Sequence, residues 1–505
     1  MRLSFTSAIL LALVGIAVAQ PIGQVSPTHL DFGSVLVGTS SPQLEVTLKN
    51  VGDAVMTVSS VSTSGPFAVG ANKCQKALKT GASCKVWVTY TPQSPETDTG
   101  VLTFSDTASN SPQTVSLTGT GAMAETLYEF PSSGKNGALP VSTVILDAKG
   151  NLYGATSYGG TSKNCLFNGL RVGCGTVYKL TPGGKQTVLH NFAGLDGAIP
   201  SGGLVLDSQG NLFGTTGEGG VYGYGTVFKL TASGTETVLY SFTGQTDGAY
   251  PWEPLVLDAQ GNLYGTTSEG GIYGYGTVYK MSQSGNETVM YNFGSLPNDG
   301  SYPIGAMVLD GQGNLYGATF WGGMNGTGTV FKVTPSGEET VLHSFTGERA
   351  GGMDGAYPDE GLSFDTQGNL YGTTLYGGAY GDGTNGYGTV FMVTPSGVES
   401  LLYNFGGYAD DGIYPYGVVV DSQGSLYGTT SAGGSGGGTV FKLTPDGTET
   451  AIYSFALGGG NAQAGVVFDS KGNLYGATRL GGNFQKNRKQ VCHYGCGVVY
   501  AVVTK

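Results

Sequence analysis

The chain has 505 residues, a formal net charge of −12 and only 23 Lys and Arg residues, with no basic cluster. This charge balance excludes nucleic acid as an expected partner. Glycine accounts for 90 residues without a triplet period, which excludes collagen, and 30 Tyr with 21 Phe exclude an acidic disordered chain. The composition is typical of an all-β protein with many tight turns, and the length allows two or more domains.

Residues 1–19 have the pattern of a secretory signal peptide. Met1-Arg2 precedes an apolar run from Ala8 to Val18, and an A-x-A site ends at Ala19. We expect cleavage after Ala19 and a secreted or cell-surface protein with no membrane span in the mature chain. An uncleaved N-terminal anchor is the alternative, although the apolar run is short for a bilayer.

The six cysteines form three local pairs, and export permits disulfides. Local pairing is one of several possible connectivities, and metal ligation by thiols is the rival interpretation. No set of His and Cys residues in the sequence has convincing zinc-ligand spacing, since His493 beside Cys492 is isolated. We therefore predict no cysteine-bound metal and the disulfides Cys74–Cys84, Cys165–Cys174 and Cys492–Cys496.

Residues 24–121 predict a first domain of short strands. Apolar and polar residues alternate in 44–48, 85–90, 100–104 and 114–117, as in half-buried strands. About seven such strands in roughly 100 residues favour an immunoglobulin-like β-sandwich. The segments 30–38 and 81–92 resemble Hydin-type immunoglobulin-like domains, which implies an adhesive or spacing module without chemistry.

A repeat occupies 122–505. Its Gly-Asn/Ser-Leu-aromatic-Gly core recurs every 48 to 60 residues, at Gly150, Gly210, Gly261, Gly313, Gly368, Gly424 and Gly472. Each unit contains four apolar runs, so seven units predict a seven-bladed β-propeller of four-stranded antiparallel blades. The chain supplies a spare fourth strand at 126–130 and ends on a third strand at 497–502. We expect these two segments to pair and close the ring, which removes open sheet edges.

The repeat units include Gly-Thr-Val-Phe-Lys-Leu-Thr-Pro and Asp-Gly-Ala-Tyr-Pro. They closely resemble the bacterial tandem repeat called GloVer, found in choice-of-anchor proteins of the cell exterior. The resemblance covers about 126–505. It implies the architecture and leaves the function open.

Loop lengths separate the two faces of the predicted disc. The first-to-second link is always Asp-x-x-Gly-Asn/Ser, and the third-to-fourth link is an equally short turn, as in 334–338. The other two links vary in length and composition, for example across 376–388. Recognition sites favour variable loops on a rigid base, so we predict the variable face as the binding face.

Aromatic residues are frequent in the variable links, where they could bind a sugar or a protein surface. Packing between neighbouring blades is the alternative interpretation, especially for the repeated Tyr before Pro. Residues that depart from the repeat are better binding candidates. The ligand-binding candidates are Trp252, Trp321, Tyr416, Tyr224, Tyr275, Tyr387, Glu218 and Glu269.

Two sets of aspartates recur. The seven in the first tight turn, such as Asp258, are predicted to be structural. The second set, Asp196, Asp247, Asp299, Asp354 and Asp411, precedes Gly in the variable links and could hold Ca²⁺. Hydrogen bonds within the turn are the alternative. We predict no obligatory cofactor.

Catalytic signals are weak. Gly433-Gly-Ser-Gly-Gly437 fits G-x-S-x-G formally, yet it lies between two strands and not at a strand-to-helix elbow. The sequence therefore predicts a non-catalytic, monomeric adhesion protein of the bacterial exterior that binds glycan or protein. The alternatives are an extracellular lyase or hydrolase that uses residues such as Glu218 and Glu269, and a structural envelope component.

Overall fold

The computed structural model describes residues 19–37, 40–41, 43–167, 170–182, 184–347, 353–381, 386–457, 460–482, 492 and 495–503. The predicted signal peptide up to residue 18, His493 and part of the 376–388 link lie outside these residues. The chain divides into two compact units, Met1–Gly121 and Ala122–Lys505. Every regular element of the described residues is a β-strand. The described residues include no helix with the length and apolar character to span a bilayer.

The first unit contains two antiparallel sheets. One has the order β1-β3-β6-β5; in the other, β2 and β7 both pair with β8 and β4 pairs with β7. The strands are β1 (Gly23–Ser26), β2 (His29–Leu36), β3 (Leu44–Asn50), β4 (Val58–Thr63), β5 (Phe67–Asn72), β6 (Ser83–Tyr90), β7 (Thr97–Asp106) and β8 (Gln113–Glu129).

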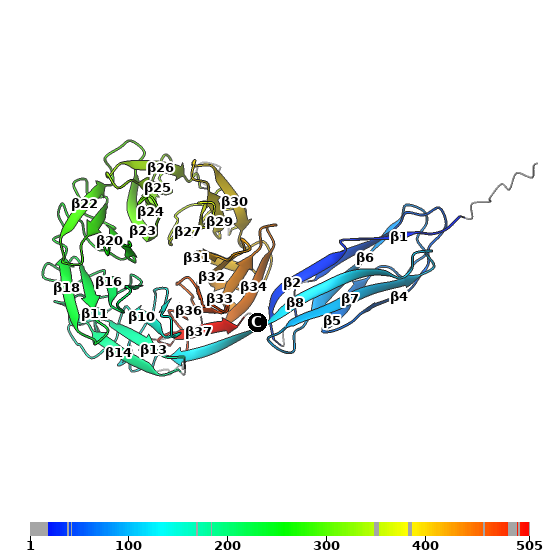
Figure 1. Cartoon of the computed structure of the whole chain (residues 1–505), viewed down its shortest axis with the longest axis horizontal. Helices are drawn as coiled ribbons and strands as arrows, with labels where there is room; N and C mark the ends of the chain where they lie inside the picture. The colour runs from blue at the N-terminus through cyan, green and yellow to red at the C-terminus, as the bar shows by residue number, and fades with distance from the viewer. Residues whose placement is uncertain are drawn as a thin grey trace, which may run out of the picture. The chain divides into compact units, whose positions relative to one another are not determined.

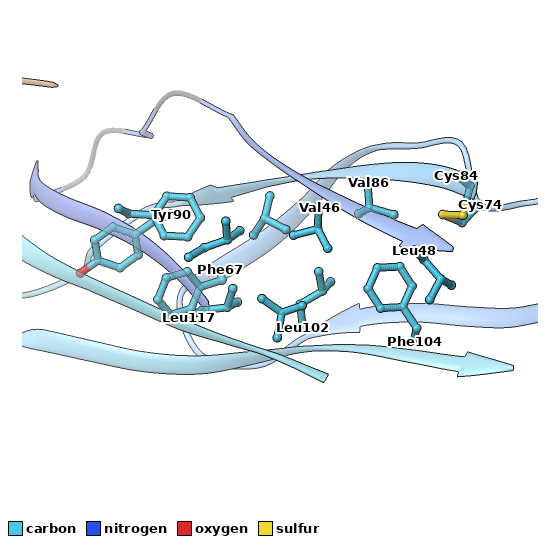
Figure 2. Packing of buried hydrophobic residues seen from close by; sticks show 14 of the residues in the cluster. Val46, Leu48, Phe67, Cys74, Cys84, Val86, Tyr90, Leu102, Phe104 and Leu117 are labelled. Carbon is cyan, nitrogen blue, oxygen red and sulfur yellow. A yellow bond between two sulfur atoms is a disulfide. The ribbon is translucent and has the colours of Figure 1, made fainter. Parts of the chain in front are cut away.

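Alternating residues of both sheets form one core in this unit. Val46 of β3, Val86 of β6, Leu102 of β7 and Leu117 of β8 are fully buried, as period-two strands require (Figure 2). The predicted Cys74–Cys84 disulfide is confirmed at one end of this core, with an S–S distance of 2.02 Å.

The second unit consists of four-stranded antiparallel sheets that follow one another along the chain. We number these sheets one to seven in chain order. Figure 1 shows them arranged around a common centre, with the fourth strands β18, β22, β26, β30 and β34 at the periphery. The six complete sheets are β9 (Ile145–Leu146), β10 (Leu152–Thr156), β13 (Thr176–Leu180), β14 (Gln186–Asn191); β15 (Val205–Leu206), β16 (Leu212–Thr216), β17 (Thr226–Leu230), β18 (Glu236–Ser241); β19 (Val256–Leu257), β20 (Leu263–Thr267), β21 (Thr277–Met281), β22 (Glu287–Asn292); β23 (Gly300–Leu309), β24 (Leu315–Gly322), β25 (Thr329–Val333), β26 (Glu339–Ser344); β27 (Ser363–Phe364), β28 (Leu370–Thr374), β29 (Thr389–Val393), β30 (Glu399–Asn404); and β31 (Gly412–Val420), β32 (Leu426–Gly433), β33 (Gly436–Leu443), β34 (Glu449–Ala456). A small hairpin of β11 (Cys165–Phe167) and β12 (Leu170–Val172) lies in the first variable link.

The seventh sheet takes its fourth strand from the start of the unit. It contains β35 (Val467–Phe468), β36 (Leu474–Thr478) and β37 (Val498–Val503), and β37 pairs with β8 from Met123 to Glu129. The predicted pairing of 126–130 with the end of the chain is therefore present. It extends three residues further toward the N-terminus than expected.

A phenylalanine at the end of each fourth strand, or immediately after it, joins each sheet to the next. The ring of Phe130 meets Tyr178 of the first sheet edge-to-face, with centroids 5.2 Å apart, and Phe455 of the sixth sheet meets Tyr500 of the seventh at 5.1 Å. The five intermediate contacts are Phe192–Phe228, Phe242–Tyr279, Phe293–Phe331, Phe345–Phe391 and Phe405–Phe441. Each sheet thus buries an aromatic ring against its successor, and the seventh does so against the first.

The Asp-x-x-Gly-Asn/Ser turns are held by their own side chains. Asp258 Oδ1 accepts hydrogen bonds from the backbone N–H groups of Gln260 and Asn262, and Oδ2 accepts from the Asn262 amide and the Tyr264 hydroxyl. These bonds lower the pKa of Asp258 although partial burial opposes them. This network accounts for the most repeated motif of the sequence as a structural one.

Candidate functional site

The two variable links of each sheet, the one before its first strand and the one between its second and third strands, lie side by side in the sheets described next. Backbone bridges pair Ala198 with Glu218 and Ala249 with Glu269, and in the fourth sheet Ser301 pairs with Trp321. Residues of the second-to-third and fourth-to-first links therefore share one surface, which we call the variable face.

Every sheet has a residue in the left-handed conformation before its inner strand or near the start of that strand. Six of the seven are followed by Pro, and four are tyrosines. They are Leu139, Ile199, Tyr250, Tyr302, Tyr357, Tyr414 and Asn461, with φ between 54° and 67°. This conformation is costly for bulky residues, so the surrounding structure must hold it. The Tyr250 N–H, for example, donates to the Tyr224 carbonyl at 2.9 Å.

In the link before the third sheet, the residues that follow Tyr250 approach the second sheet. These residues include Trp252 and Glu253. Ser201 Oγ donates to the Trp252 carbonyl at 3.3 Å, and Thr215 Oγ1 donates to the Glu253 carbonyl at 2.9 Å. The second sheet thus fixes the backbone that carries both side chains.

A pocket of about 280 Å³ lies on the variable face where the seventh, first, second and third sheets meet. Trp252, Tyr158, Glu218 and Arg479 line it together with Leu139, Val141, Ser157 and Ile199. It combines two aromatic rings, one carboxylate and one guanidinium. Such a pocket offers apolar contact and both hydrogen-bond donors and acceptors.

The position of Trp252 depends on Gly217. A Cβ atom added at Gly217 would lie 1.9 Å from the Trp252 ring, so no larger residue fits beneath it. The equivalent positions in the other six sheets carry Ser157, Ser268, Phe320, Leu375, Ser431 and Arg479. The Trp252 and Gly217 combination is therefore local to this pocket.

A second group of titratable residues contains Glu253, Asp359 and Glu360, from links before the third and fifth sheets. Burial and the charge of Asp359 raise the pKa of Glu253 to about 8, with the Gly305 N–H opposing this shift. Burial raises the pKa of Asp359 to about 7, and burial together with both neighbours raises the pKa of Glu360 well above its ordinary value. These carboxyls are only partly exposed, and they repel one another when ionised.

Arg479 is linked to this group through Gln463 and Tyr416. Its Nη1 donates to Gln463 Oε1 at 3.0 Å, and Gln463 Nε2 lies 3.5 Å from the Tyr416 hydroxyl. Burial and the charges of Asp359 and Glu360 raise the pKa of Tyr416, while Arg479 opposes them. Residues of the fifth, sixth and seventh sheets are therefore electrostatically coupled.

Aromatic rings form a continuous row along the variable face. Tyr302 lies 5.1 Å from Trp321, and Phe320 stacks on Tyr357 at 5.0 Å. Tyr376 continues the row, with its ring 6.0 Å from Tyr357 and 5.6 Å from Tyr414. Tyr250 stacks on Trp252 at 6.2 Å in a separate pair at the pocket.

The structure places the eight predicted ligand-binding candidates in different surroundings. Trp252 and Glu218 share the pocket, and Trp321 joins the aromatic row with 49% of its surface exposed. Tyr275 is also exposed, at 54%, while Tyr387 is half-buried against Tyr414. Tyr224 has an exposed ring that contacts Tyr250. Glu269 is an exposed residue, and burial together with the charge of Glu269 raises the pKa of Tyr250.

Tyr416, the eighth predicted candidate, is almost fully buried, with only 9% of the residue exposed. Its backbone forms part of strand β31, and its side chain faces the buried carboxyls instead of solvent. The departure of Tyr416 from the repeat pattern therefore marks a residue that differs from its counterparts in other sheets, but its side chain is buried and not exposed for binding.

The five aspartates that were Ca²⁺ candidates make local hydrogen bonds. Asp247, for example, accepts bonds from Tyr240 and from the Thr243 backbone and hydroxyl. These contacts belong to the outer part of each sheet junction. They match the interpretation as turn bonds.

A larger cleft of about 560 Å³ lies on the other face, between the turns of the second and third sheets. Its lining includes Asp207 and Asp258, whose carboxylates are already bonded within their own turns. We therefore place the candidate site at the smaller pocket, where the charged side chains do not form the hydrogen bonds of an Asp-x-x-Gly-Asn turn.

Sequence reasoning missed Glu253, Asp359, Glu360 and Arg479. The signal was present, because uncharged residues occupy the matching positions of other sheets. Ser201 matches Asp359, Gly202 and Gly305 match Glu253 and Glu360, and Gly217 matches Arg479. The Cys165–Cys174 and Cys492–Cys496 disulfides, by contrast, are confirmed. They fasten the variable links of the first and seventh sheets.

The chain matches two family models. Residues 164–384 and 374–489 match the Gloeobacter/Verrucomicrobia repeat, and residues 21–120 match the HYDIN/CFA65/VesB-like, Ig-like domain. No curated protein matches the chain.

Solved structures resemble parts of the chain at low identity. The extracellular domain of a putative hybrid two-component system from B. thetaiotaomicron is 13% identical, covers 75% of this chain and 43% of its own, and has a TM-score of 0.45. A quinonprotein alcohol dehydrogenase-like protein from Bacteroides thetaiotaomicron is 12% identical, with coverage of 86% and 96% and a TM-score of 0.34. The VesB protease of Vibrio cholerae is 17% identical, with coverage of 20% and 32% and a TM-score of 0.17. The chain spans 51%, 43% and 32% of the first three structures that it matches.

Proposed function

The chain belongs to the Gloeobacter/Verrucomicrobia repeat family, and from this premise we propose that it is a secreted, non-catalytic glycan-binding protein of the bacterial exterior. In this proposal the first unit is an immunoglobulin-like sandwich that acts as a spacer. The second is a seven-bladed β-propeller that carries the binding face. The cyclic series of phenylalanine contacts and the β8–β37 pairing support the propeller.

One observation carries the binding proposal: the aromatic pocket of Trp252 and Tyr158 also contains Glu218 and Arg479. A sugar ring presents apolar C–H groups to aromatic faces and hydroxyls to charged donors and acceptors, and this pocket supplies both. The row from Trp321 to Tyr414 adds rings for further sugar units. The proposed ligand is therefore an extended polysaccharide.

Polysaccharide binding should depend on the position of the Trp252 ring against Gly217. We expect Gly217→Ala to weaken polysaccharide binding at least 10-fold, because the added methyl displaces the Trp252 ring. Gly311→Ala is the matched control, since a Cβ there meets nothing within 4 Å and the backbone does not require glycine. Affinity electrophoresis and calorimetry against a panel of neutral and acidic polysaccharides would measure the effect.

Equal affinity of Gly217→Ala, Gly311→Ala and the unaltered protein for a bound polysaccharide would contradict this site. Retention of a protein ligand, with no polysaccharide bound, would favour the protein-binding alternative. Failure to bind either class would favour a structural envelope component.

A second candidate function is polysaccharide cleavage, favoured by the convergence of Glu253, Asp359 and Glu360. A carboxyl with a pKa of about 8, such as Glu253, stays protonated at neutral pH and can act as a general acid. Glu253→Gln should then abolish release of reducing ends while binding is retained. If the unaltered protein releases no product from any bound polysaccharide, the non-catalytic proposal holds.

A further inference from the structure

A three-residue arrangement recurs at the outer junctions between consecutive sheets. A fourth-strand His or Tyr bonds to the link Asp, and the first Glu of the next sheet's fourth strand interacts electrostatically with that Asp. The five sets are His190–Asp196–Glu236, Tyr240–Asp247–Glu287, Tyr291–Asp299–Glu339, His343–Asp354–Glu399 and Tyr403–Asp411–Glu449.

The Asp and Glu positions change together along the chain. Before the first sheet, Asn136 and Gln186 stand in their places, and the Gln186 side-chain amide donates to the Asn136 carbonyl at 3.2 Å. In the seventh sheet Ala124 occupies the register position of Glu236, and the link that precedes this sheet lacks the Asp-Gly pair. Carboxylates are thus present as pairs or absent as pairs. This pattern implies that the two side chains act as one unit.

The junction of the first and second sheets differs from the other four. At this junction His190, Asp196 and Glu236 each offer one atom that can ligate a metal, and these three atoms lie within 4.8 Å of one another. His190 Nε2 is 3.0 Å from Asp196 Oδ2. Among the described residues, this is the one such group of three. Glu236 Oε1 is buried there without a hydrogen-bond partner, as is an oxygen of the matching glutamate at each of the other four junctions, and only at this junction of the described chain does a histidine nitrogen complete such a group. An oxygen in that condition calls for a proton or a cation.

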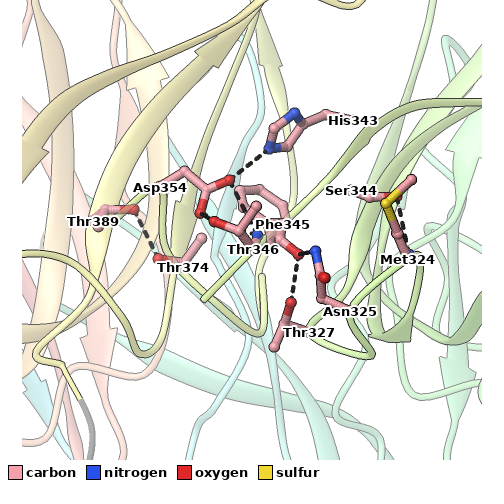
Figure 3. Close-up of polar contacts among 10 residues, drawn as sticks. All are labelled: Met324, Asn325, Thr327, His343, Ser344, Phe345, Thr346, Asp354, Thr374 and Thr389. Carbon is pink, nitrogen blue, oxygen red and sulfur yellow. Dashed lines mark hydrogen bonds and ion pairs between the residues drawn. The ribbon is translucent and has the colours of Figure 1, made fainter. Parts of the chain in front are cut away.

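The other histidine junction shows why the first is special. Figure 3 shows Asp354 bonded to His343 and also to Thr346, whose hydroxyl and N–H both donate to the carboxylate. The position of Thr346 is Ala193 at the first junction, so only a backbone N–H reaches Asp196 Oδ1, at 2.7 Å. The Asp196 carboxylate therefore keeps acceptor capacity that Asp354 has used.

We propose that His190 Nε2, Asp196 and Glu236 bind a divalent transition metal of the Zn²⁺ class. The imidazole nitrogen favours Zn²⁺ over Ca²⁺ or Mg²⁺, which prefer oxygen ligands, and two carboxylates balance the charge of the ion. The ion would connect strand β14 of the first sheet to β18 of the second. It would also give Glu236 Oε1 the partner that it lacks.

The full-length protein, dialysed against Zn²⁺ and analysed for bound metal, tests this site. We expect one equivalent of Zn²⁺ in the unaltered protein and in His343→Tyr, and its loss in His190→Tyr. Tyr is the natural residue at the matching position of three other junctions, so His190→Tyr should fold. Ala193→Thr, which introduces the hydroxyl found at the other histidine junction, should weaken binding at least 10-fold.

Thermal unfolding gives an independent readout. Zn²⁺ should raise the Tm of the unaltered protein and of His343→Tyr but leave that of His190→Tyr unchanged. Stoichiometric binding that survives in His190→Tyr, or no binding by the unaltered protein, would overturn the proposal. Both outcomes leave the glycan-binding test unaffected, because the polysaccharide pocket contains none of these three residues.

Discussion

Replacing Glu339 with glutamine is expected to stabilise the protein at alkaline pH, by about 1–3 kcal/mol at pH 9, with little effect at pH 5. Both Glu339 carboxyl oxygens are buried without a hydrogen-bond partner. Burial and the charge of Asp299 raise the pKa of Glu339 from 4.5 to about 8. The folded protein therefore holds a proton on Glu339 that the unfolded chain releases.

The sign of the pH dependence follows from this difference. The pKa of Glu339 is 4.5 in the unfolded chain and about 8 in the folded protein. The contribution of Glu339 to stability is therefore fully present below pH 4.5 and is lost as the pH rises through about 8. Glutamine stays neutral throughout, and Gln186 already occupies the matching position in the first sheet. Substitution should thus remove the part of the loss of stability between pH 5 and pH 9 that Glu339 contributes.

Urea unfolding at pH 5 and pH 9 would measure this effect. Glu338→Gln is the matched control, because Glu338 is an exposed residue in the turn immediately before strand β26, and its substitution should give the same small change at both pH values. A Glu339→Gln protein whose stability relative to the unaltered protein is the same at pH 5 and pH 9 would show that Glu339 is ionised in the folded state.

The parts of the structure that the sequence predicted well are those set by local chemistry. The Asp258 turn needs only an acceptor side chain, two nearby N–H groups and a glycine, all within five residues. Disulfides between cysteines close in sequence, such as Cys165–Cys174, are likewise local. Such features repeat in the sequence because each solves the same problem within its own unit.

Features that depend on neighbouring sheets were harder to predict. Glu253 and Asp359 are far apart in the sequence, and the effect of the Asp359 charge on the pKa of Glu253 arises only when the inner links of separate sheets converge. The left-handed Tyr250 is a similar case, since a residue before proline ordinarily favours extended backbone. Its conformation is held by the carbonyl of Tyr224 in the preceding link, a contact that no single repeat unit reveals.

Phe130→Ala is expected to have the largest effect of the substitutions considered. Phe130 is almost fully buried, and its ring packs edge-to-face on Tyr178 immediately after strand β8. Removing a buried phenylalanine ring costs about 3–5 kcal/mol, which is a large share of the stability of a typical domain. The unfolding midpoint in urea should therefore fall sharply, with a smaller fall in Phe130→Leu.

The comparison with Phe345→Ala makes this a test of ring closure. Phe345 makes the same contact with Phe391 in the middle of the repeat region. In a closed ring the two phenylalanines are equivalent, so both substitutions should destabilise the protein by similar amounts. In an open array Phe130 would belong to a terminal strand, which can fray without loss of the remaining sheets. A small effect of Phe130→Ala beside a large effect of Phe345→Ala would therefore contradict the propeller, whereas equal losses require that the seventh sheet be held to the first as firmly as any other neighbouring pair.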